Sequence, residues 1–533
     1  MTRITNGDLY ALRRDAQSRA GAGVQMTQEL GAELAQVEIS FPSFRGGLDY
    51  SQAPHNVSTD FTQETRNVVI TERGYLKRTP GHMIAETMAA RVVRDMHLHP
   101  SLDFSAELLL FDAPFIGVKS TGATVWYDAE LPTASRWIGV TNGEDFVFSD
   151  GNTILWRRPF AGTPGVVAIP DAPAGRTIAN FAGRVFLGGF TQLGVYQSLG
   201  IYWSGGSGLV TDWTGIGSGA ELLISNNATD DRIIAMRPMS FDILAILCQK
   251  NIWVGLRTGD PNRPADFQQR TTGIGCIAEP TAQVTPIGVI FLSEGGVYVF
   301  DGNNASLLSG TINAALLPID RSNINRYSAT YDTIESRYWL YTPQGTWCFE
   351  LKHNRWTFLT SVVENSVVFS QQFVALTWEA STGTWANAAG AWEDASPSAG
   401  AQAIVMSRGN VLAMYSDSSY SFLDGQSTIA RYRLGPRDTP EADSMFTLQR
   451  AIIRYRGSTT GMAISYKRPS DGADVSWRLL TLPDRGREYN VAEIGGSQTM
   501  IGMDVFVEWN QPTIEICHVK IKGMFRSSER IML

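Results

Sequence analysis

Two histidines separated by a single residue are the first place where this sequence could do chemistry. His97-Leu98-His99 would set two imidazoles on one face of a strand, where both could bind a metal ion. A metal site needs more ligands than these, and no cysteine or carboxylate cluster lies near them in the sequence. The pattern favours two ordinary surface histidines, and we assign no metal ligand.

Carboxylates and small polar residues form two further groups that could do chemistry. A glycosidase needs two carboxylates about 5–9 Å apart in a pocket. The adjacent pair Glu393-Asp394 stands beside a glycine-rich loop and is more simply a solvated turn. Residues 149–153, SDGNT, together with Trp156, resemble the Asp-box of sialidase-type propellers, except that the usual intervening residue between Ser and Asp is missing. Because such boxes are structural turns, this stretch also predicts a turn.

A glycine-rich stretch, Gly205-Gly206-Ser207-Gly208, could in principle surround a phosphate group. It lacks the Lys-Ser/Thr pair and the helix that follow in a phosphate-binding loop, so we predict a turn. No Gly-x-Ser-x-Gly elbow and no Cys-His pairing stands out in the sequence. We therefore assign no catalytic residue and no cofactor, and we predict that the protein is not an enzyme.

Three tryptophans at seven-residue intervals form the most distinctive aromatic pattern. Trp378, Trp385 and Trp392 lie in the stretch 373–400, where Ser381–Gly383 and Gly390 break any helix and so exclude a coiled coil. Short hairpin edges in an inserted loop fit this spacing better. Exposed aromatic residues often anchor interfaces, so these three are candidate contacts for a partner or a glycan.

The composition excludes several classes of protein. The 533 residues are 43% hydrophobic and 18% charged, with a net charge of −8, which does not resemble a basic nucleic-acid clamp. Residues 1–10 lack the basic head and apolar body of a signal peptide, and no run approaches ~18 apolar residues. Cys248, Cys276, Cys348 and Cys517 stand far apart, which predicts buried thiols in a reducing compartment. We expect neither export nor a membrane span, and assembly in a cytoplasm.

The elements that must hold these residues are short antiparallel strands. Val289–Leu292 is an apolar run, Glu294-Gly295-Gly296 supplies a turn, and Val297–Phe300 returns before a second turn at residues 301–302. Two strands joined by a glycine turn predict a hairpin. We expect Gly295 to need a positive φ, which a β-branched residue resists.

Similar hairpins recur along the middle of the chain. Units that begin at residues 137, 184, 243, 289, 337 and 403 repeat the plan, and three of the five steps between them are close to the ~40–50-residue period of a propeller blade. The 51 glycines and 14 tryptophans suit many turns and aromatic strands. The sequence therefore predicts an all-β fold with a β-propeller of six or seven blades.

The organisation changes along the chain. Residues 1–36 are polar and alanine-rich and predict a short arm that is partly helical or disordered. Residues 37–435 hold the repeats and form the predicted propeller, with 373–400 as an insertion. Residues 445–533 contain at least five alternating segments and predict a C-terminal β-sandwich. Residues 83–99 leave two alternatives: one helix, from apolar residues at four-residue spacing, or a pair of strands.

Three groups of residues resemble one protein family. The first group is the stretch 44–49, FRGGLD, with Asn67–Ile70, Gly74–Arg78 and Pro80-Gly81. The second is the stretch 183–188, GRVFLG, with 202–204 and 211–213; the third is 331–332 with 337–339, Trp347 and Trp356. In this order, across Val37–Phe358, they look like the β-propeller tail proteins of short-tailed bacteriophages, which are called tail nozzle, tail hub, tail tubular or packaged-DNA stabilisation proteins.

The resemblance implies a structural protein of the virion, located in a phage tail and assembled in the host cytoplasm. It implies a homo-hexameric ring below the portal and adaptor rings, with tail fibre, spike or needle proteins as further partners. The ring would complete the channel that retains the genome and then delivers it. Genomic DNA would pass through without sequence-specific binding, and a slightly acidic protein suits this because a basic wall would hold phosphates and slow transit.

The alternative is a carbohydrate-binding propeller, either a receptor-recognition or a depolymerase subunit. The tryptophans of 378–392 support this hypothesis, since sugar sites stack on aromatic faces.

Overall fold

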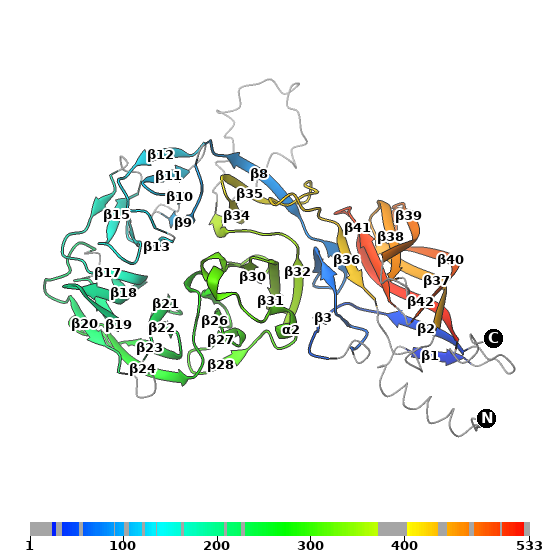
Figure 1. The fold of residues 1–533 in the computed structure, drawn as a ribbon, viewed down its shortest axis with the longest axis horizontal. Coiled ribbons are helices and arrows are strands. Elements are labelled where there is room, and N and C mark those ends of the chain that lie inside the picture. The colour runs from blue at the N-terminus through cyan, green and yellow to red at the C-terminus, as the bar shows by residue number, and fades with distance from the viewer. Residues whose placement is uncertain are drawn as a thin grey trace.

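The computed structural model describes residues 24–27, 35–52, 57–89, 91–100, 106–119, 123–134, 136–160, 165–206, 210–224, 230–370, 402–434, 445–467, 474–501 and 504–526. Within these residues the helices are short: η2 (Glu279–Thr281), α2 (Asn313–Leu316) and η3 (Arg321–Arg326). All other regular elements in this part of the chain are strands, which confirms the predicted all-β fold. Figure 1 shows a ring of small sheets beside a second group of longer strands.

The ring consists of seven four-stranded antiparallel sheets, which we number in chain order. Sheets 1 to 3 are β9 (Asp95–Pro100), β10 (Ala106–Asp112), β11 (Phe115–Lys119), β12 (Val125–Asp128); β13 (Ile138–Asn142), β14 (Asp145–Ser149), β15 (Trp156–Pro159), β16 (Val167–Ala168); and β17 (Ala174–Phe181), β18 (Arg184–Gln192), β19 (Val195–Trp203), β20 (Gly219–Leu222). Sheets 4 and 5 are β21 (Ile233–Pro238), β22 (Ile243–Cys248), β23 (Asn251–Arg257), β24 (Ala265–Thr272); and β25 (Gln283–Thr285), β26 (Gly288–Ser293), β27 (Gly296–Phe300), β28 (Ala305–Leu307). Sheets 6 and 7 are β29 (Ser328–Asp332), β30 (Arg337–Thr342), β31 (Gly345–Glu350), β32 (Arg355–Leu359); and β33 (Asn365–Ser370), β34 (Gln402–Arg408), β35 (Val411–Ser416), β8 (Gly81–Thr87).

The predicted hairpins form the paired middle of these sheets. All six predicted units appear as strand pairs: β13 with β14, β18 with β19, β22 with β23, β26 with β27, β30 with β31, and β34 with β35. Sheet 1 holds a further hairpin, β10 with β11. The arrangement of sheets is consistent with a β-propeller.

Sheet 5 shows why an inner strand of the ring such as β26 is buried along its whole length. Every residue of β26 is buried. Ile290 packs in a cluster with Tyr338 of sheet 6, while its neighbour Phe291 packs in a cluster with Leu247 of sheet 4. Successive side chains of a strand point to opposite faces, so a sheet with a neighbour on each face needs apolar residues at every position.

Sheet 7 contains strands from two distant parts of the chain. Its outer strand is β8, which pairs with β35 with Gly81 opposite Ser416. Its first strand, β33, lies against β29 of sheet 6 and also against β9 of sheet 1. Met83–Thr87 lies in β8 and Asp95–His99 lies in β9, so the helix alternative is wrong. The stretch contributes two strands, as the other alternative expected, but they belong to different sheets and do not pair with each other.

The second region is a sandwich of two sheets around one core. The larger sheet has the order β1 (Val24–Thr27), β2 (Ala35–Phe41), β42 (Glu515–Arg526), β37 (Met445–Arg456), β40 (Asn490–Ile501), with β6 (Val68–Ile70) and β7 (Leu76–Arg78) attached through β42. The smaller sheet has the order β39 (Asp474–Leu482), β38 (Thr459–Lys467), β41 (Val505–Trp509), β36 (Ala430–Arg433), β5 (Thr65–Arg66). A short parallel pair, β3 (Gly47–Leu48) and β4 (Phe61–Thr62), lies between the two regions. Phe41, Leu76, Tyr432, Ile453 and Trp509 all belong to the sandwich core.

The boundary of the sandwich differs from the predicted one. The predicted propeller, residues 37–435, includes β2, β5, β6, β7 and β36, all of which lie in the sandwich sheets. The predicted arm, residues 1–36, is described at 24–27 and 35–36, and there it is strand. Phe41 pairs with Val519, and pairing over such a separation leaves no local pattern in the sequence. The predicted insertion, 373–400, lies outside the described residues.

The turn of the β26–β27 hairpin also differs from the prediction. The turn residues are Glu294 and Gly295, and Ser293 pairs with Gly296. The positive φ, +127°, belongs to Gly296, whereas Gly295 lies outside the left-handed region. A Cβ on Gly296 would lie 2.3 Å from Ser309 Oγ, so the backbone and the close neighbour both require glycine there.

Candidate functional site

The three tryptophans predicted as partner contacts, Trp378, Trp385 and Trp392, lie outside the described residues, as does the pair Glu393-Asp394. Two other places in the described part of the chain bring functional side chains together. One is a polar network that joins sheets 1, 6 and 7, and the other is an aromatic pocket beside sheet 6.

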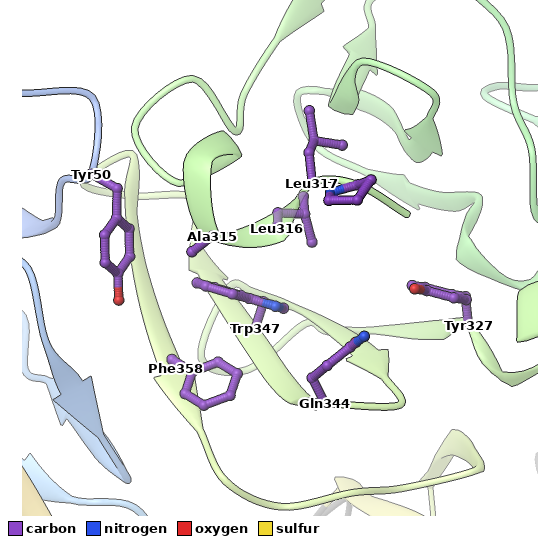
Figure 2. Close-up of a pocket in the computed structure, with 9 residues that line it drawn as sticks. Tyr50, Ala315, Leu316, Leu317, Tyr327, Gln344, Trp347 and Phe358 are labelled. Carbon is purple, nitrogen blue, oxygen red and sulfur yellow. The ribbon is translucent and has the colours of Figure 1, made fainter. Parts of the chain in front are cut away.

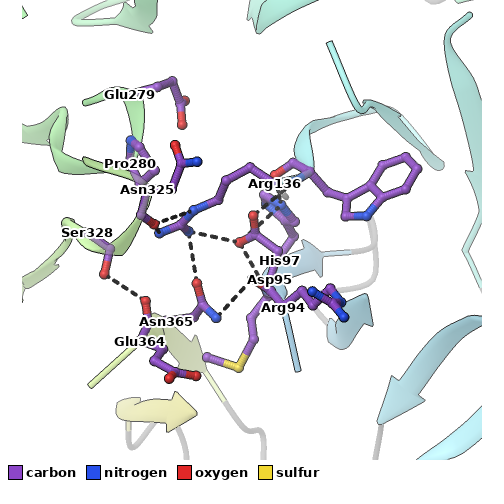
Figure 3. A network of polar contacts seen from close by, with 12 residues as sticks. Arg94, Asp95, His97, Arg136, Glu279, Pro280, Asn325, Ser328, Glu364 and Asn365 are labelled. Atoms are coloured by element: carbon purple, nitrogen blue, oxygen red, sulfur yellow. Dashed lines mark hydrogen bonds and ion pairs between the residues drawn. The ribbon is translucent and has the colours of Figure 1, made fainter. Parts of the chain in front are cut away.

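Arg136 is the centre of the polar network (Figure 3). It lies in the loop between β12 and β13 and donates hydrogen bonds from Nε and Nη2 to the carbonyl of Asn325, at 3.1 and 2.6 Å. Its Nη1 donates to Asn365 Oδ1 at 2.9 Å and lies 3.5 Å from Asp95 Oδ1. Asp95 begins β9 and Asn365 begins β33, while Asn325 lies in η3, the short helix that leads into β29, so Arg136 connects sheets 1, 6 and 7.

Neighbouring bonds complete this connection. Asn365 Nδ2 donates to the carbonyl of Arg94 at 3.1 Å, and Ser328 Oγ donates to the carbonyl of Glu364 at 3.2 Å. The first strand of sheet 7 is thereby bonded to sheet 1 on one side and to sheet 6 on the other. The network holds together the ends at which these strands begin.

The carboxylates of the network already have partners. Asp95 accepts hydrogen bonds from the backbone N–H groups of Met96 and Trp137, both at 3.0 Å. Glu364 Oε2 accepts from Gly409 N at 2.9 Å, and Glu279 pairs with Arg237. A general acid and base need carboxylates that can exchange protons with a substrate. These carboxylates fix loops instead, so the network acts as a brace.

The two histidines next to the network differ from the prediction. Nε2 of His97 lies 2.8 Å from the carbonyl of Trp137, to which the imidazole donates. His99 is fully buried, and its pKa falls to about 4 because of burial and the charge of Arg158, which pairs with Glu107. His99 is therefore a neutral core residue rather than a surface residue. Within the described residues, no group of three His, Cys, Asp or Glu side chains could hold a metal ion.

The stretch 149–153 is a structural turn, as predicted. Asp150 Oδ1 accepts hydrogen bonds from Asn152 N at 3.0 Å and from Thr153 N at 2.7 Å. Ser149 Oγ accepts from Gly151 N at 2.9 Å. These bonds satisfy the backbone donors of the turn and use up the carboxylate oxygen.

The predicted burial of all four cysteines is confirmed, and each is a free thiol. Burial raises the pKa of Cys276, Cys348 and Cys517 to about 12, and that of Cys248 also rises. A nucleophilic cysteine needs a lowered pKa. These thiols therefore serve as packing residues.

The aromatic pocket lies between sheet 6 and the segment that carries α2 (Figure 2). It has a volume of about 400 Å³. Tyr50, Tyr327, Trp347 and Phe358 supply its aromatic rings, and Gln344 supplies an amide at its edge. The remaining lining residues are Ala315, Leu316, Leu317 and Pro318.

Backbone and side-chain bonds hold the walls of this pocket. Tyr50 N donates to the carbonyl of Thr311 at 2.6 Å, which fixes Tyr50 to the segment before α2. Tyr327 Oη accepts from Asp320 N at 3.2 Å. The rings of Trp347 and Phe358 contact each other with centroids 4.8 Å apart. Burial, together with the charge of Glu64, raises the pKa of the Tyr50 hydroxyl, which therefore stays protonated.

No pattern in the sequence pointed to Arg136 or Tyr50. Arg136 is one of many arginines in loops, and its partners Asn325 and Asn365 lie 189 and 229 residues further along the chain. Tyr50 follows a polar turn, and its neighbours in the pocket lie more than 260 positions further along the chain. A local pattern cannot report contacts of this range. No helix among the described residues is long and apolar enough to cross a membrane.

Comparisons with known proteins give no family. No family model matches the chain, and no curated protein matches it. Among solved structures, BamB from Moraxella catarrhalis aligns with a TM-score of 0.33 at 7% identity, over 63% of this chain and 97% of that one. An exo-β-1,3-galactanase from Phanerochaete chrysosporium, in complex with galactose, aligns with a TM-score of 0.23 at 8% identity, over 83% of this chain and 100% of that one. A second structure of that enzyme, with β-1,3-galactotriose, gives 0.20 at 9% identity, over 94% and 96%. The chain is thus similar to β-propeller proteins, at TM-scores too low to carry an argument about function.

Proposed function

We propose that this protein is a structural component of a short phage tail, a nozzle or hub ring that completes the channel for the genome. In this proposal its seven sheets are the blades of a closed propeller. In it, strand β8 supplies the outer strand of the last blade, and the contact of β33 with β9 supports closure between the last blade and the first.

The proposal rests on where the residues that resemble the phage-tail family lie in the structure: members of its first and third groups are in contact. Gly47, from the first family-like group, has a φ of +73°, and a Cβ there would come within 2.7 Å of the carbonyl of Trp356, from the third group. Arg355, next to Trp356, donates to the carbonyls of Ile70 and Thr71 at 2.7 and 3.0 Å. Residues far apart in the sequence thus form one joint between the ring and the sandwich. Their spacing in the sequence has a structural reason, which supports the resemblance.

The brace at Arg136 bears on how such a protein would conduct DNA. Arg136 connects the neighbouring sheets 1, 6 and 7, and in this proposal these bonds stay intact because DNA does not pass along the axis of a single propeller. A genome channel would therefore have to lie between subunits. Identical subunits that meet head-to-tail close into a ring and enclose such a channel, and six copies are the number that the resemblance implies.

The charge of the chain suits the wall of a DNA channel. Six copies at −8 each carry −48 formal charges, so a continuous belt of Lys and Arg along the lumen is not expected. DNA that slides needs weak and evenly spread contacts rather than deep phosphate sites. In this proposal the partners are the portal and adaptor rings above, and tail fibre, spike or needle proteins.

Electron microscopy tests the ring directly. Class averages of the purified protein and of assembled particles should show a six-fold ring at the tail. Particles assembled without this protein should fail to retain or deliver their genome. The proposal fails if such particles package, hold and deliver DNA normally.

Affinity for DNA gives a second test. At ~150 mM salt, where charges beyond ~8 Å are screened, the purified ring should bind duplex DNA more weakly than about 1 µM. Submicromolar affinity with a steep salt dependence would instead indicate a clamp. The carbohydrate-binding alternative predicts that a glycan screen on the isolated protein gives a positive result through Trp378, Trp385 and Trp392.

A further inference from the structure

We propose that the aromatic pocket beside sheet 6 binds a neutral saccharide unit. The pocket is formed by Tyr50, Tyr327, Trp347 and Phe358 with the amide of Gln344 (Figure 2). Its lining residues lie at positions 50 and 315–358 of the sequence, outside the stretch 378–392, and the inference does not depend on the assembly of a tail ring.

The lining of the pocket selects against charged ligands. None of its nine lining residues carries a charge. A phosphate or carboxylate that entered would lose its hydration without meeting an opposite charge, which is strongly unfavourable. The ligand must therefore be neutral.

The polar groups of the pocket select against a purely apolar ligand. Among the described residues, neither the Gln344 amide nor the Tyr50 hydroxyl has a hydrogen-bond partner, and Figure 2 shows the indole nitrogen of Trp347 on the side that faces Gln344. An apolar ligand would cover these groups and leave them unpaired, at a cost of about 1–3 kcal/mol each. A ligand with hydroxyl groups would pair with them.

The rings complete the selection. A pyranose ring has apolar C–H faces and hydroxyl groups around its edge, so it can contact Tyr50 and Phe358 with a face and Gln344 with an edge. The pocket volume of about 400 Å³ falls in the range of small-molecule sites, which suits a short saccharide. The bonds of Tyr50 to Thr311 and of Tyr327 to Asp320 fix the walls before the ligand arrives, which reduces the ordering cost of binding.

The test uses the full-length protein and a panel of neutral mono- and disaccharides, including glucose, galactose and N-acetylglucosamine. Binding is measured by ligand-observed NMR and by tryptophan fluorescence. At least one neutral sugar should bind saturably below about 10 mM, whereas inorganic phosphate and glucuronate should not. An uncharged proline-rich peptide is included because such peptides also use aromatic grooves.

Two variants remove single polar groups without emptying the pocket. Gln344→Leu and Tyr50→Phe should each weaken sugar binding by about 3- to 10-fold, the value of one hydrogen bond. The matched controls, Gln192→Leu at an exposed end of β18 and Tyr196→Phe on β19, should leave binding unchanged. Thermal unfolding confirms that all four variants are folded.

The inference is overturned if no neutral sugar binds, or if both pocket variants bind like the parent protein. It is also overturned if the peptide binds and sugars do not compete with it. Ring formation, seen by electron microscopy, is a separate readout, so loss of sugar binding leaves the tail proposal standing and the reverse also holds.

Discussion

The ring and the sandwich are both all-β, but the chain builds them in different ways. In sheets 1 to 6 every strand pairs with its neighbour in the sequence, so each sheet is completed within one stretch of chain. In the larger sandwich sheet, β2 pairs with β42, and β7 joins the same strand. One region is thus assembled from local contacts and the other from contacts between the two ends of the described chain.

This difference indicates which change to the chain would unfold each region. A sheet of the ring contributes to two interfaces, one on each face, and its neighbours support it on both sides. The sandwich depends on strands supplied by residues 35–78, without which its larger sheet loses β2, β6 and β7. Sheet 7 of the ring is joined directly to the sandwich along the chain. Its outer strand, β8, follows immediately after β7, which belongs to the larger sandwich sheet.

The largest expected effect is a truncation in the core of either region. Phe41→Ala in the sandwich and Phe291→Ala in the ring both empty fully buried sites and should each lower the free energy of unfolding by about 3–5 kcal/mol. Phe41→Ala should unfold the sandwich first and leave the ring protected, as measured by hydrogen exchange on 243–300. Equal loss of protection in both regions after Phe41→Ala would show that they unfold as one unit.

The next-largest effect compares the loss of stability when each of the two glycines of the β26–β27 turn is replaced. Gly296→Val places a Cβ 2.3 Å from Ser309 Oγ and 2.5 Å from Asn313 Oδ1, at a φ of +127°. The backbone strain alone costs about 1–3 kcal/mol, and the clash adds to it. Gly295→Val is the matched control, where the nearest atom is Tyr298 Oη at 3.0 Å, and it should cost less than about 1 kcal/mol. Chemical denaturation compares the two, and a larger loss for Gly295→Val would contradict the assignment.

A smaller effect should depend on pH, through a histidine on the strand that connects the two regions. Burial lowers the pKa of His82 on β8 to about 3, and its Nδ1 accepts a hydrogen bond from Leu423 N at 3.1 Å. The unfolded chain, with a pKa near 6.5, binds the proton more readily, so this contribution to stability is complete above pH 6.5 and is lost as the pH falls toward 3. The loss is about 2 kcal/mol at pH 5.

The measurement for His82 is the slope of unfolding free energy against pH between 4 and 7. His82→Gln should flatten this slope, whatever its effect on stability at pH 7. His353→Gln, which changes a partly exposed histidine beside Glu350, is the control and should retain the slope. An unchanged slope in His82→Gln would place the acid sensitivity elsewhere.

The smallest effect is expected at the brace. Arg136→Lys keeps the charge but loses the fork that reaches Asn325 and Asn365, which should lower stability by about 1–2 kcal/mol. Arg263→Lys, at an exposed pair with Glu221, should change stability by less than about 0.5 kcal/mol. Differential scanning calorimetry distinguishes these two outcomes. If both variants unfold alike, the brace contributes no more to stability than an exposed ion pair does.

The same contrast explains what could be predicted from the sequence. The hairpin at Val289–Phe300 could be predicted because an apolar run, a turn and a second apolar run follow one another within a dozen residues. Which of the two adjacent glycines has the positive φ could not be predicted, because both Gly295 and Gly296 permit it. In the structure Gly296 has the positive φ, and Ser309 and Asn313 lie close to where its Cβ would be; the sequence pattern does not show these neighbours.

The sandwich boundary and the candidate sites needed tertiary contacts. Apolar and polar residues alternate in the strand at 35–41 as in any half-buried strand. No neighbouring residue indicates that its partner is β42. The pocket likewise gathers Tyr50 with residues from 315 to 358, each of which is ordinary in its own segment.

Because β2 pairs with β42, strand β2 stays without this partner for most of the synthesis of the chain. Ser40 and His518, which lie 2.7 Å apart through Oγ and Nε2, are separated by 478 positions. At about 5–20 residues per second, a ribosome makes Ser40 roughly 25–100 s before His518. Throughout that interval β2 has an unpaired edge, while the sheets of the ring can already form behind it. A chain cut short before β42 would keep that edge open permanently, available for pairing with another chain.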